Sequence, residues 1–228
     1  MRGAKRRGNL NTMIISLTGF MGCGKSSVGR KLSELLCCPF MDLDDAIVES
    51  AGRSIPEIFA TEGEPAFRQM ELEALKEMVP LPYNRHTSME ALSPTLILAL
   101  GGGTVMTPEC AEIVREETCC VYLKASIETL MEHLAGEADG RPMLTNASSA
   151  ETSTSAAEPH TSPQVADTSS QGAHTSLRGA ERRGNPLYDR ITELMAQRSE
   201  TYEKTAHIII DTDGKSIEAI ASEILHLI

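Results

Sequence analysis

The sequence contains no tryptophan, and aromatic residues make up only 4% of its 228 positions. It also contains no apolar run that approaches the ~20 residues needed to span a membrane. The apolar stretch near the start, Met13–Thr18, is too short even for the core of a signal peptide. We therefore expect a soluble cytoplasmic protein that has no membrane partner.

Basic residues are also in short supply. The chain has 21 Lys and Arg against 32 Asp and Glu, which gives a formal net charge of −11. An excess of negative charge disfavours general affinity for nucleic acid or anionic membranes, although single arginines can still hold small anions. We expect no nucleic-acid partner.

The six cysteines form no C-x-x-C pair and have no histidines at zinc-ligand spacing. We expect reduced and mostly buried thiols at Cys23, Cys37, Cys38, Cys110, Cys119 and Cys120. Cys23 differs from the others because it lies in a glycine-rich loop before a predicted helix. A helix start lowers a thiol pKa, so oxidation of Cys23 is a hypothesis.

The clearest motif is Gly19–Ser26, which matches the phosphate-loop pattern G-x-x-x-x-G-K-[ST]. Its glycines allow backbone amides to surround phosphate oxygens, Lys25 supplies positive charge, and the Ser26 hydroxyl suits Mg²⁺. We expect ATP contacts from Gly22, Cys23, Gly24, Lys25, Ser26 and Ser27. A glycine turn that binds nothing is disfavoured by its context. A short strand precedes the motif, and a helix over 25–36 follows, with an apolar face of Val28, Leu32, Leu35 and Leu36.

Carboxylates follow the next predicted strand, 39–45. Asp42 and Asp44 are two residues apart, so their side chains point the same way in an extended backbone. The carboxyl ends of parallel strands meet at the ligand crevice. We expect one of the two to hold Mg²⁺ and the other to receive a proton. Alternatively, Asp44 or Asp45 only caps the helix 46–51.

Further candidates come later in the chain. Arg68 lies on a predicted helix, 64–79, where Glu64 and Glu71 at four and three residues' distance also permit plain surface salt bridges. The predicted strand 95–100 ends in the glycines 101–103, which allow close backbone approach to a ligand. Arg141 stands in a loop, and Arg198 lies near the end of a helix predicted over 186–204.

Five predicted strands alternate with helices, which indicates an α/β fold with a parallel sheet covered on both faces. We expect one domain over 13–228, preceded by a disordered basic tail, 1–12. Residues 146–184 are rich in Ser, Thr and Ala and contain no aromatic residue. Such a segment cannot bury enough surface to order itself, so we expect a disordered insert.

The phosphate loop leaves the class of protein open. A switch GTPase would need D-x-x-G soon after the loop and N-K-x-D for guanine. The only D-x-x-G here is 211–214, near the far end, and N-K-x-D is missing. We also find no apolar strand ending in D-E, which is typical of motor ATPases. A small-molecule kinase is the remaining class.

At this point the chain resembles the shikimate kinase family over 13–135 and 141–228, apart from the insert. The resemblance depends on the order and spacing of several motifs: 19–26, 42–44, 63–68 with Glu71, 101–103, Arg141-Pro142, and Arg198 with Tyr202. It implies a P-loop fold of the nucleoside monophosphate kinase type, with strand order 2-3-1-4-5 and a mobile lid. It also implies transfer of the γ-phosphoryl of ATP to the 3-hydroxyl of shikimate by a monomer.

The resemblance further implies a role for each candidate residue. Asp44 binds the substrate hydroxyls and acts as the base, while Arg68 and Arg198 hold the carboxylate. Gly102 contributes backbone contacts to shikimate, and Arg141 descends with the lid onto the phosphates. The implied Mg²⁺ ligands are Ser26 and Asp42.

Two features depart from the family pattern, and two alternatives stay open. The insert lengthens the connection after the arginine-proline pair, and only His133 stands where many relatives carry a basic residue that stacks on adenine. One alternative is another kinase of the same fold, which phosphorylates gluconate or a nucleoside monophosphate. The other is a protein that binds ATP without catalysis.

Overall fold

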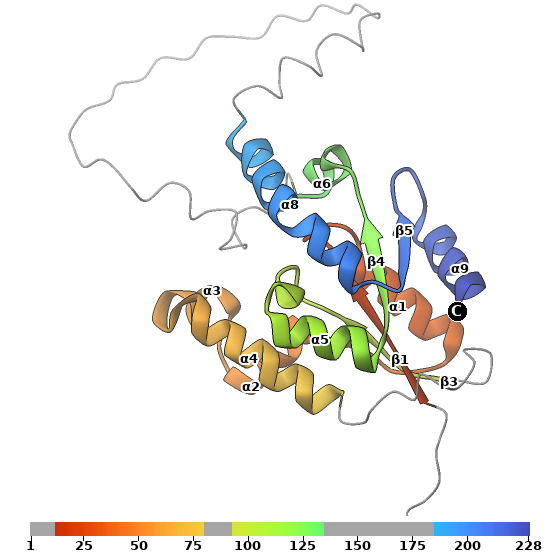
Figure 1. Ribbon diagram of the computed structural model, residues 1–228, viewed down its shortest axis with the longest axis horizontal. Helices are drawn as coiled ribbons and strands as arrows, with labels where there is room; N and C mark the ends of the chain where they lie inside the picture. Colours follow the sequence, from red (N-terminus) through yellow and green to blue (C-terminus); the bar gives the residue numbers. More distant parts are fainter. Residues whose placement is uncertain (1–11, 80–92, 135–184) are drawn as a thin grey trace, which may run out of the picture.

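The structure is a computed structural model of the whole chain, and it describes residues 12–79, 93–134 and 185–228 (Figure 1). Residues 1–11, 80–92 and 135–184 lie outside this description. The expectations for the basic tail up to residue 11, for the Ser/Thr-rich insert and for Arg141 therefore fall on residues that are not described. Thr12, which was expected in the disordered tail, is instead the first residue of a strand.

The described residues form a five-stranded parallel sheet with the order β2-β3-β1-β4-β5. The strands are β1 (Thr12–Thr18), β2 (Phe40–Asp42), β3 (Ser93–Ala99), β4 (Cys119–Lys124) and β5 (Ile208–Asp211). This order confirms the expected P-loop architecture. β1 lies at the centre, so the loop that follows it opens between the ends of β3 and β4.

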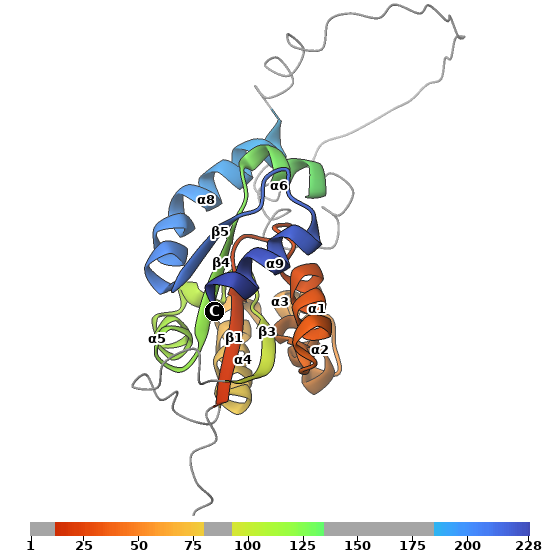
Figure 2. The same ribbon diagram turned by 90° about the vertical axis from the view of Figure 1, so that its right-hand side faces the viewer.

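Helices cover both faces of the sheet. They are α1 (Lys25–Leu36), α2 (Leu43–Ala51), α3 (Ile55–Thr61), α4 (Gly63–Met78), α5 (Pro108–Glu117), α6 (Ile127–Leu134), α8 (Pro186–Thr205) and α9 (Ile217–Leu227), with a 3-10 turn η2 (Thr104–Met106). Figure 2 shows α5 and α8 on one side of the sheet and α1 on the other. Within the described part of the chain, no helix is both long and apolar enough to cross a bilayer.

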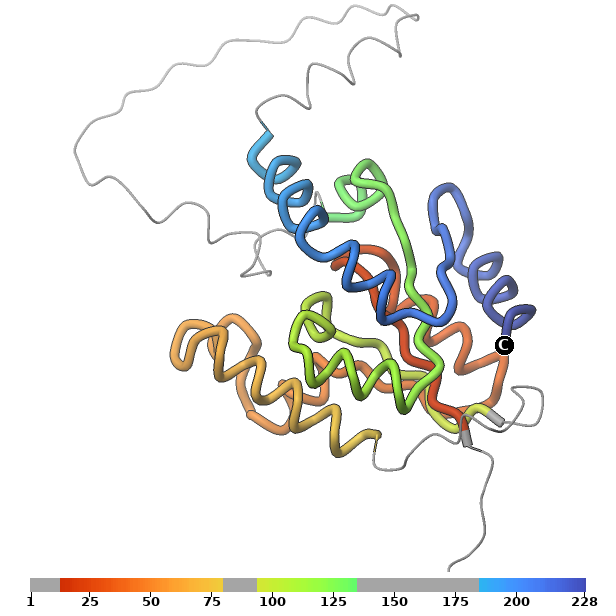
Figure 3. The backbone as a smooth tube through the Cα atoms, viewed as in Figure 1, coloured from red at the N-terminus to blue at the C-terminus, as the bar shows by residue number. Residues whose placement is uncertain are grey.

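Two clusters of buried side chains fill the space between the sheet and its helices. Alternate residues of β1 and β4 point to opposite faces, as expected for strands. Leu17 and Val121 pack toward α1, α6 and α9, whereas Tyr122 packs in the cluster that contains α4 and α5. Figure 3 traces α2, α3 and α4 as one group beside β2 and β3, away from α9. This group supplies several of the candidate site residues.

The start of α2 differs from its prediction. The strand was predicted to run through Asp45, but β2 ends at Asp42 and α2 begins at Leu43. The cause is local capping: the Asp42 carboxylate accepts a hydrogen bond from the Asp44 backbone N–H at 3.1 Å. The helix cap is therefore Asp42, so the alternative in which Asp44 or Asp45 caps this helix was wrong.

Helix boundaries are otherwise close to those expected. The predicted span of α1 is confirmed. At the start of α3, Ser54 and Glu57 exchange hydrogen bonds in a capping box. The predicted apolar face of α1 is wrong at one position: Leu35 is 48% exposed, while Val28 and Leu32 are buried. The face of α1 that packs on the sheet is thus narrower than predicted.

Candidate active site

The phosphate loop joins β1 to α1 and has the backbone geometry that its glycines allow. Gly19 has a φ of 140°, and a Cβ there would lie 2.6 Å from the carbonyl oxygen of Leu123. Gly24 has a φ of 91° and caps α1, with open space where a Cβ would stand. The loop therefore presents a bare backbone and a helix start to the cavity, which suits an anion.

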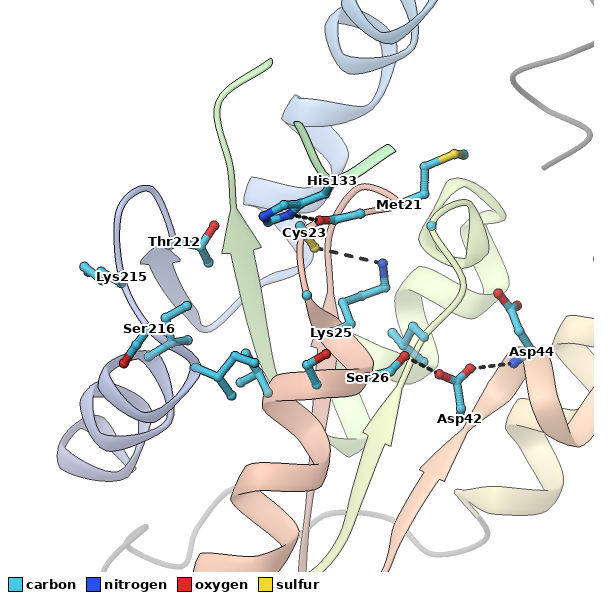
Figure 4. Close-up of a pocket in the computed structure, with 18 of the residues that line it drawn as sticks. Met21, Cys23, Lys25, Ser26, Asp42, Asp44, His133, Thr212, Lys215 and Ser216 are labelled. Carbon is cyan, nitrogen blue, oxygen red and sulfur yellow. Dashed lines mark hydrogen bonds between the residues drawn. The ribbon is translucent and has the colours of Figure 1, made fainter. Parts of the chain in front are cut away.

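Lys25 lies inside this loop. Its Nζ donates hydrogen bonds to the carbonyl oxygens of Gly19 and Phe20, each at 3.0 Å, and lies 4.0 Å from the Cys23 sulfur. Figure 4 shows the side chain lining the cavity. The ammonium group is thus held at the loop, where it can neutralise a bound phosphate.

Ser26 and Asp42 meet at the end of the loop. The Ser26 hydroxyl donates to the Asp42 carboxylate at 2.6 Å, although the two residues come from different elements (Figure 4). Among the described residues, no group of three or more His, Cys, Asp or Glu could enclose a metal ion. A pair of hard oxygens beside a phosphate loop fits Mg²⁺, because this ion takes most of its remaining ligands from water and phosphate.

Asp44 lines the same cavity from the first turn of α2. Burial raises the pKa of its carboxyl to about 6, and the carboxylates of Asp42 and Glu71 act in the same direction, whereas Lys25 opposes them. The expectation that Asp42 and Asp44 face one site is met by a helix start rather than by an extended strand.

The glycines 101–103 allow side chains from several elements to lie close together. A Cβ on Gly101 would lie 2.7 Å from Asp44 Oδ1, 2.8 Å from Glu71 Oε1 and 2.9 Å from Thr104 Oγ1. These three oxygens can converge only because position 101 has no side chain. A Cβ on Gly102 would stand 3.2 Å from the Met21 amide, so this turn also touches the phosphate loop.

Arg68 is oriented by two glutamates of its own helix. Its Nη1 lies 2.5 Å from Glu71 Oε2, and its Nη2 lies 2.8 Å from Glu64 Oε1. The predicted ion pairs are present, but the arrangement is not a plain surface pair, because Glu71 is fully buried. A Cβ on Gly103 would lie 2.6 Å from Arg68 Nη2, so the guanidinium lies against the glycine turn.

Glu71 and Thr104 form a part of the site that sequence reasoning missed. The Thr104 hydroxyl donates to Glu71 Oε1 at 2.6 Å, and both residues are 0% exposed. In the sequence, Glu71 was named as a possible ion-pair partner of Arg68 and as part of a motif shared with the family, but it was given no role in the site. Its place among Phe67, Leu75 and other inward residues of the helix was the available signal, since a charged residue is buried only when its partners satisfy it.

Arg198 reaches the glycine turn from α8. It is only 5% exposed, and its Nη1 donates to the Gly102 carbonyl oxygen at 3.3 Å. The Tyr202 hydroxyl donates to the same oxygen, and the Arg198 guanidinium lies 5.9 Å from the centre of the Phe20 ring. Arg68, Gly102 and Arg198 are therefore brought together around one turn.

Arg68 and Arg198 lie beside the glycine turn but are not among the residues that line the cavity, which has a volume of about 930 Å³. From Asp44 and Gly102 it passes the phosphate loop and reaches the turn between β5 and α9, where Thr212, Lys215 and Ser216 line it (Figure 4). No residue of this turn was predicted to line a site. The sequence of the turn contains no motif that indicates binding of a nucleoside.

The expectation of a low pKa for Cys23 was wrong. Its side chain is only 3% exposed, and burial raises the pKa of the thiol above its ordinary value despite the nearby Lys25. Five of the six thiols are buried, as expected, and Cys37 is exposed. Cys23 thus packs as a small apolar side chain beneath the loop.

Comparisons with known proteins agree with this geometry. A family model described as "Shikimate kinase" matches residues 21–182. A shikimate kinase of Thermus thermophilus is 36% identical over 93% of this chain and 88% of its own length. Another, of Dictyoglomus turgidum, is 32% identical over 92% of this chain and 94% of its own length.

Solved structures give the same result. The shikimate kinase of Acinetobacter baumannii in complex with shikimate superposes with a TM-score of 0.69, at 27% identity, over 96% of this chain and 93% of that one. The Aquifex aeolicus shikimate kinase superposes with a TM-score of 0.61, at 25% identity, over 94% and 95% of the two chains. The chain described here belongs to the shikimate kinase family.

Proposed function

We propose that this protein transfers the γ-phosphoryl group of ATP to the 3-hydroxyl of shikimate, giving shikimate 3-phosphate and ADP. The observation that carries the proposal is the cavity shared by Lys25 and Asp44, with the glycine turn 101–103 touching both the phosphate loop and the acceptor-side residues. Membership of the shikimate kinase family supports the same reaction.

The donor side would hold the triphosphate. Amides of the phosphate loop and the start of α1 would bind its oxygens, with Lys25 neutralising the β- and γ-phosphates. Ser26 and Asp42 would hold Mg²⁺, which supplies charge neutralisation to the phosphates when bound. Gly22, Cys23, Gly24 and Ser27 would contribute the remaining contacts of the loop.

The acceptor side would hold an anionic polyol. Arg68 lies against Gly103 and Arg198 donates to the Gly102 carbonyl oxygen, so both reach the glycine turn. Their planar guanidinium groups suit a carboxylate better than lysines would. The backbone of Gly102 would contact the ring, while the Asp44 carboxylate would accept hydrogen bonds from its hydroxyls. These contacts would place one hydroxyl toward the phosphate loop.

In the transfer step, the 3-hydroxyl oxygen forms a bond to the γ-phosphorus, and the bond from this phosphorus to the β–γ bridging oxygen breaks. The hydroxyl proton passes to the Asp44 carboxylate. A base with a pKa of about 6 is ionised near neutral pH and still accepts a proton readily. Most of the rate acceleration would come from positioning and charge neutralisation.

Other parts of the proposal concern the whole chain. We propose that Arg141, which lies outside the described residues, neutralises charge on the transferred phosphoryl group. We also propose one domain over 13–228 with an insert at 146–184, working as a cytoplasmic monomer. The net charge of −11 supports small-molecule substrates rather than nucleic acid.

The test is a coupled assay of ADP release with Mg²⁺-ATP and shikimate, gluconate or a nucleoside monophosphate in parallel. We expect turnover with shikimate and only background with the others. A Lys25→Met variant, which keeps a long unbranched side chain but removes its charge, sets that background. Turnover with another acceptor alone would favour a different kinase, and binding of ATP without turnover would favour the non-catalytic alternative. The comparisons support neither alternative.

A further inference from the structure

The last turn of α6 contacts the phosphate loop through a histidine. His133 Nδ1 lies 2.7 Å from the carbonyl oxygen of Gly22, and Figure 4 shows this contact at the edge of the cavity. A carbonyl oxygen can only accept a hydrogen bond, so Nδ1 carries the proton and donates it. The sequence suggested His133 as a surface for adenine, and the structure gives its ring a partner in the loop.

This hydrogen bond completes the restraint of one peptide unit. The unit between Gly22 and Cys23 is held at its carbonyl end by His133, and at its amide end by a 3.2 Å hydrogen bond from Cys23 to the Phe20 carbonyl oxygen. It lies just before Gly24 and Lys25, within the loop that surrounds the phosphates. If this unit rotated, a carbonyl oxygen would face the bound anion and repel it.

The helix that carries His133 is itself firmly placed. A Cβ on Gly22 would stand 2.9 Å from the Leu134 side chain, and Leu130 and Leu134 are fully buried. At the other end of α6, the Asp213 carboxylate accepts hydrogen bonds from Ser126 N at 2.9 Å and from Thr129 Oγ1 at 2.7 Å. Because both ends of α6 are fixed, His133 can fix the loop.

We propose that His133 is a positioning residue for the nucleotide: its Nδ1–H keeps the Gly22–Cys23 peptide in the orientation that binds the triphosphate. The role belongs to the hydrogen bond, and a stacking surface for adenine is not needed. The inference rests on the proposed ATP site. Loss of one neutral hydrogen bond corresponds to an affinity change of about three- to ten-fold.

Two substitutions separate the hydrogen bond from the ring. His133→Phe keeps a flat ring that can stack but has no N–H group. His133→Asn loses the ring but places an amide N–H close to the position of Nδ1. The matched control is His226→Phe, because His226 Nδ1 also contacts a backbone carbonyl, that of Ser222 at 2.6 Å, on exposed α9 surface.

For each variant we would measure the KM values for ATP and shikimate, kcat, and the Kd for inorganic tripolyphosphate with Mg²⁺ by calorimetry. We expect His133→Phe to raise the ATP KM and the tripolyphosphate Kd about three- to ten-fold. His133→Asn should restore both values, with the shikimate KM and kcat within about two-fold of the unmodified protein. His226→Phe should change none of them.

Two results would overturn the proposal. One is an unchanged ATP KM for His133→Phe together with a raised ATP KM for His133→Asn. That result would assign the role to stacking. The other is a tripolyphosphate Kd that neither substitution changes, because tripolyphosphate has no base and reports on the loop alone. If the unmodified protein did not phosphorylate shikimate, the proposed function would fall. The tripolyphosphate series would still decide the role of His133.

Discussion

Arg198 donates a hydrogen bond to the carbonyl oxygen of Gly102, although the two residues are 96 positions apart in the chain. Gly102 also lies against the phosphate loop, since a Cβ at this position would stand 3.2 Å from the Met21 amide. A guanidinium of α8 is thereby linked through a single backbone residue to the site where phosphate is expected. Changes on the acceptor side should consequently be separable from changes on the donor side by kinetics.

Asp44→Asn should lower kcat by about 10²-fold or more, because the amide cannot accept the hydroxyl proton. The ATP KM should change by less than about two-fold, since the phosphate loop is intact. Steady-state kinetics with both substrates would check this. Glu49→Gln, an exposed substitution on the same helix, is the control. Near-normal turnover of Asp44→Asn would remove Asp44 as the base.

Arg68→Ala should raise the shikimate KM about 10- to 100-fold, which is the effect of losing a charge-assisted hydrogen bond. It should leave the ATP KM nearly unchanged. Since Ala also leaves Glu71 buried without its ion pair, Arg68→Lys is the folded comparison, which keeps the charge but not the planar fork. Arg53→Ala removes an exposed arginine that pairs with Glu62, and should alter neither KM. An unchanged shikimate KM in both Arg68 variants would return Arg68 to a purely structural role.

Gly101→Ala should reduce kcat strongly, because a methyl group would displace the carboxylates of Asp44 and Glu71. Gly52→Ala, at a residue that does not line the cavity, is the matched control: its φ of 64° makes alanine strained, but nothing lies within 4 Å of the new methyl group. That strain amounts to about 1–2 kcal/mol of stability. Unfolding in urea and turnover should be measured for both. Equal losses of turnover would indicate that general destabilisation, rather than displacement of the carboxylates, is the cause.

Asp213 should make the stability of the fold depend on pH. Partial burial works to raise the pKa of this carboxyl, but hydrogen bonds from Ser126 and Thr129 outweigh it and lower the pKa below its ordinary value of 3.8. The stabilising effect is therefore present above the unfolded-state pKa and is lost as the pH falls through the folded-state pKa. Asp213→Asn should destabilise the protein at about pH 7 and much less at about pH 3 in urea unfolding. An equal loss at both values would contradict this linkage.

Cys23 should react slowly with thiol reagents. Burial raises the pKa of its thiol and also limits access to it, whereas Cys37 is exposed. Brief treatment with iodoacetamide near neutral pH, followed by peptide mass spectrometry, should show Cys37 labelled first. Bound ATP should make little difference to that order. Preferential labelling of Cys23 would revive the hypothesis of a reactive thiol in the loop.

Much of the fold was accessible from the sequence because its signals are local. The phosphate-loop motif marks the junction of β1 and α1, and the alternation of strands and helices indicates the parallel sheet. The strand order came from family resemblance and agrees with the observed sheet. The predicted start of α2 was wrong because the sequence offers several aspartates as possible caps. Only the backbone geometry shows that Asp42 is the cap.

The parts of the site that sequence reasoning missed depend on contacts between distant elements. Thr104 reaches Glu71 across 33 positions, and His133 reaches Gly22 across 111. Neither contact leaves a periodic pattern or a motif in the chain. The prediction of a low pKa for the Cys23 thiol was wrong for a related reason. The helix start is visible in the sequence, but the burial that raises the pKa is a property of the packed core.

The contact of Gly102 with the phosphate loop also bears on inhibitor chemistry. If ATP and shikimate bind as proposed, the γ-phosphoryl group and the 3-hydroxyl meet in one continuous cavity, beside the contact of Gly102 with the loop. A short tether between an adenosine phosphate and a cyclic hydroxy acid would then span both halves of the cavity. Once one end had bound, the other would meet its site at millimolar effective concentration, so such a conjugate should bind far more tightly than either fragment.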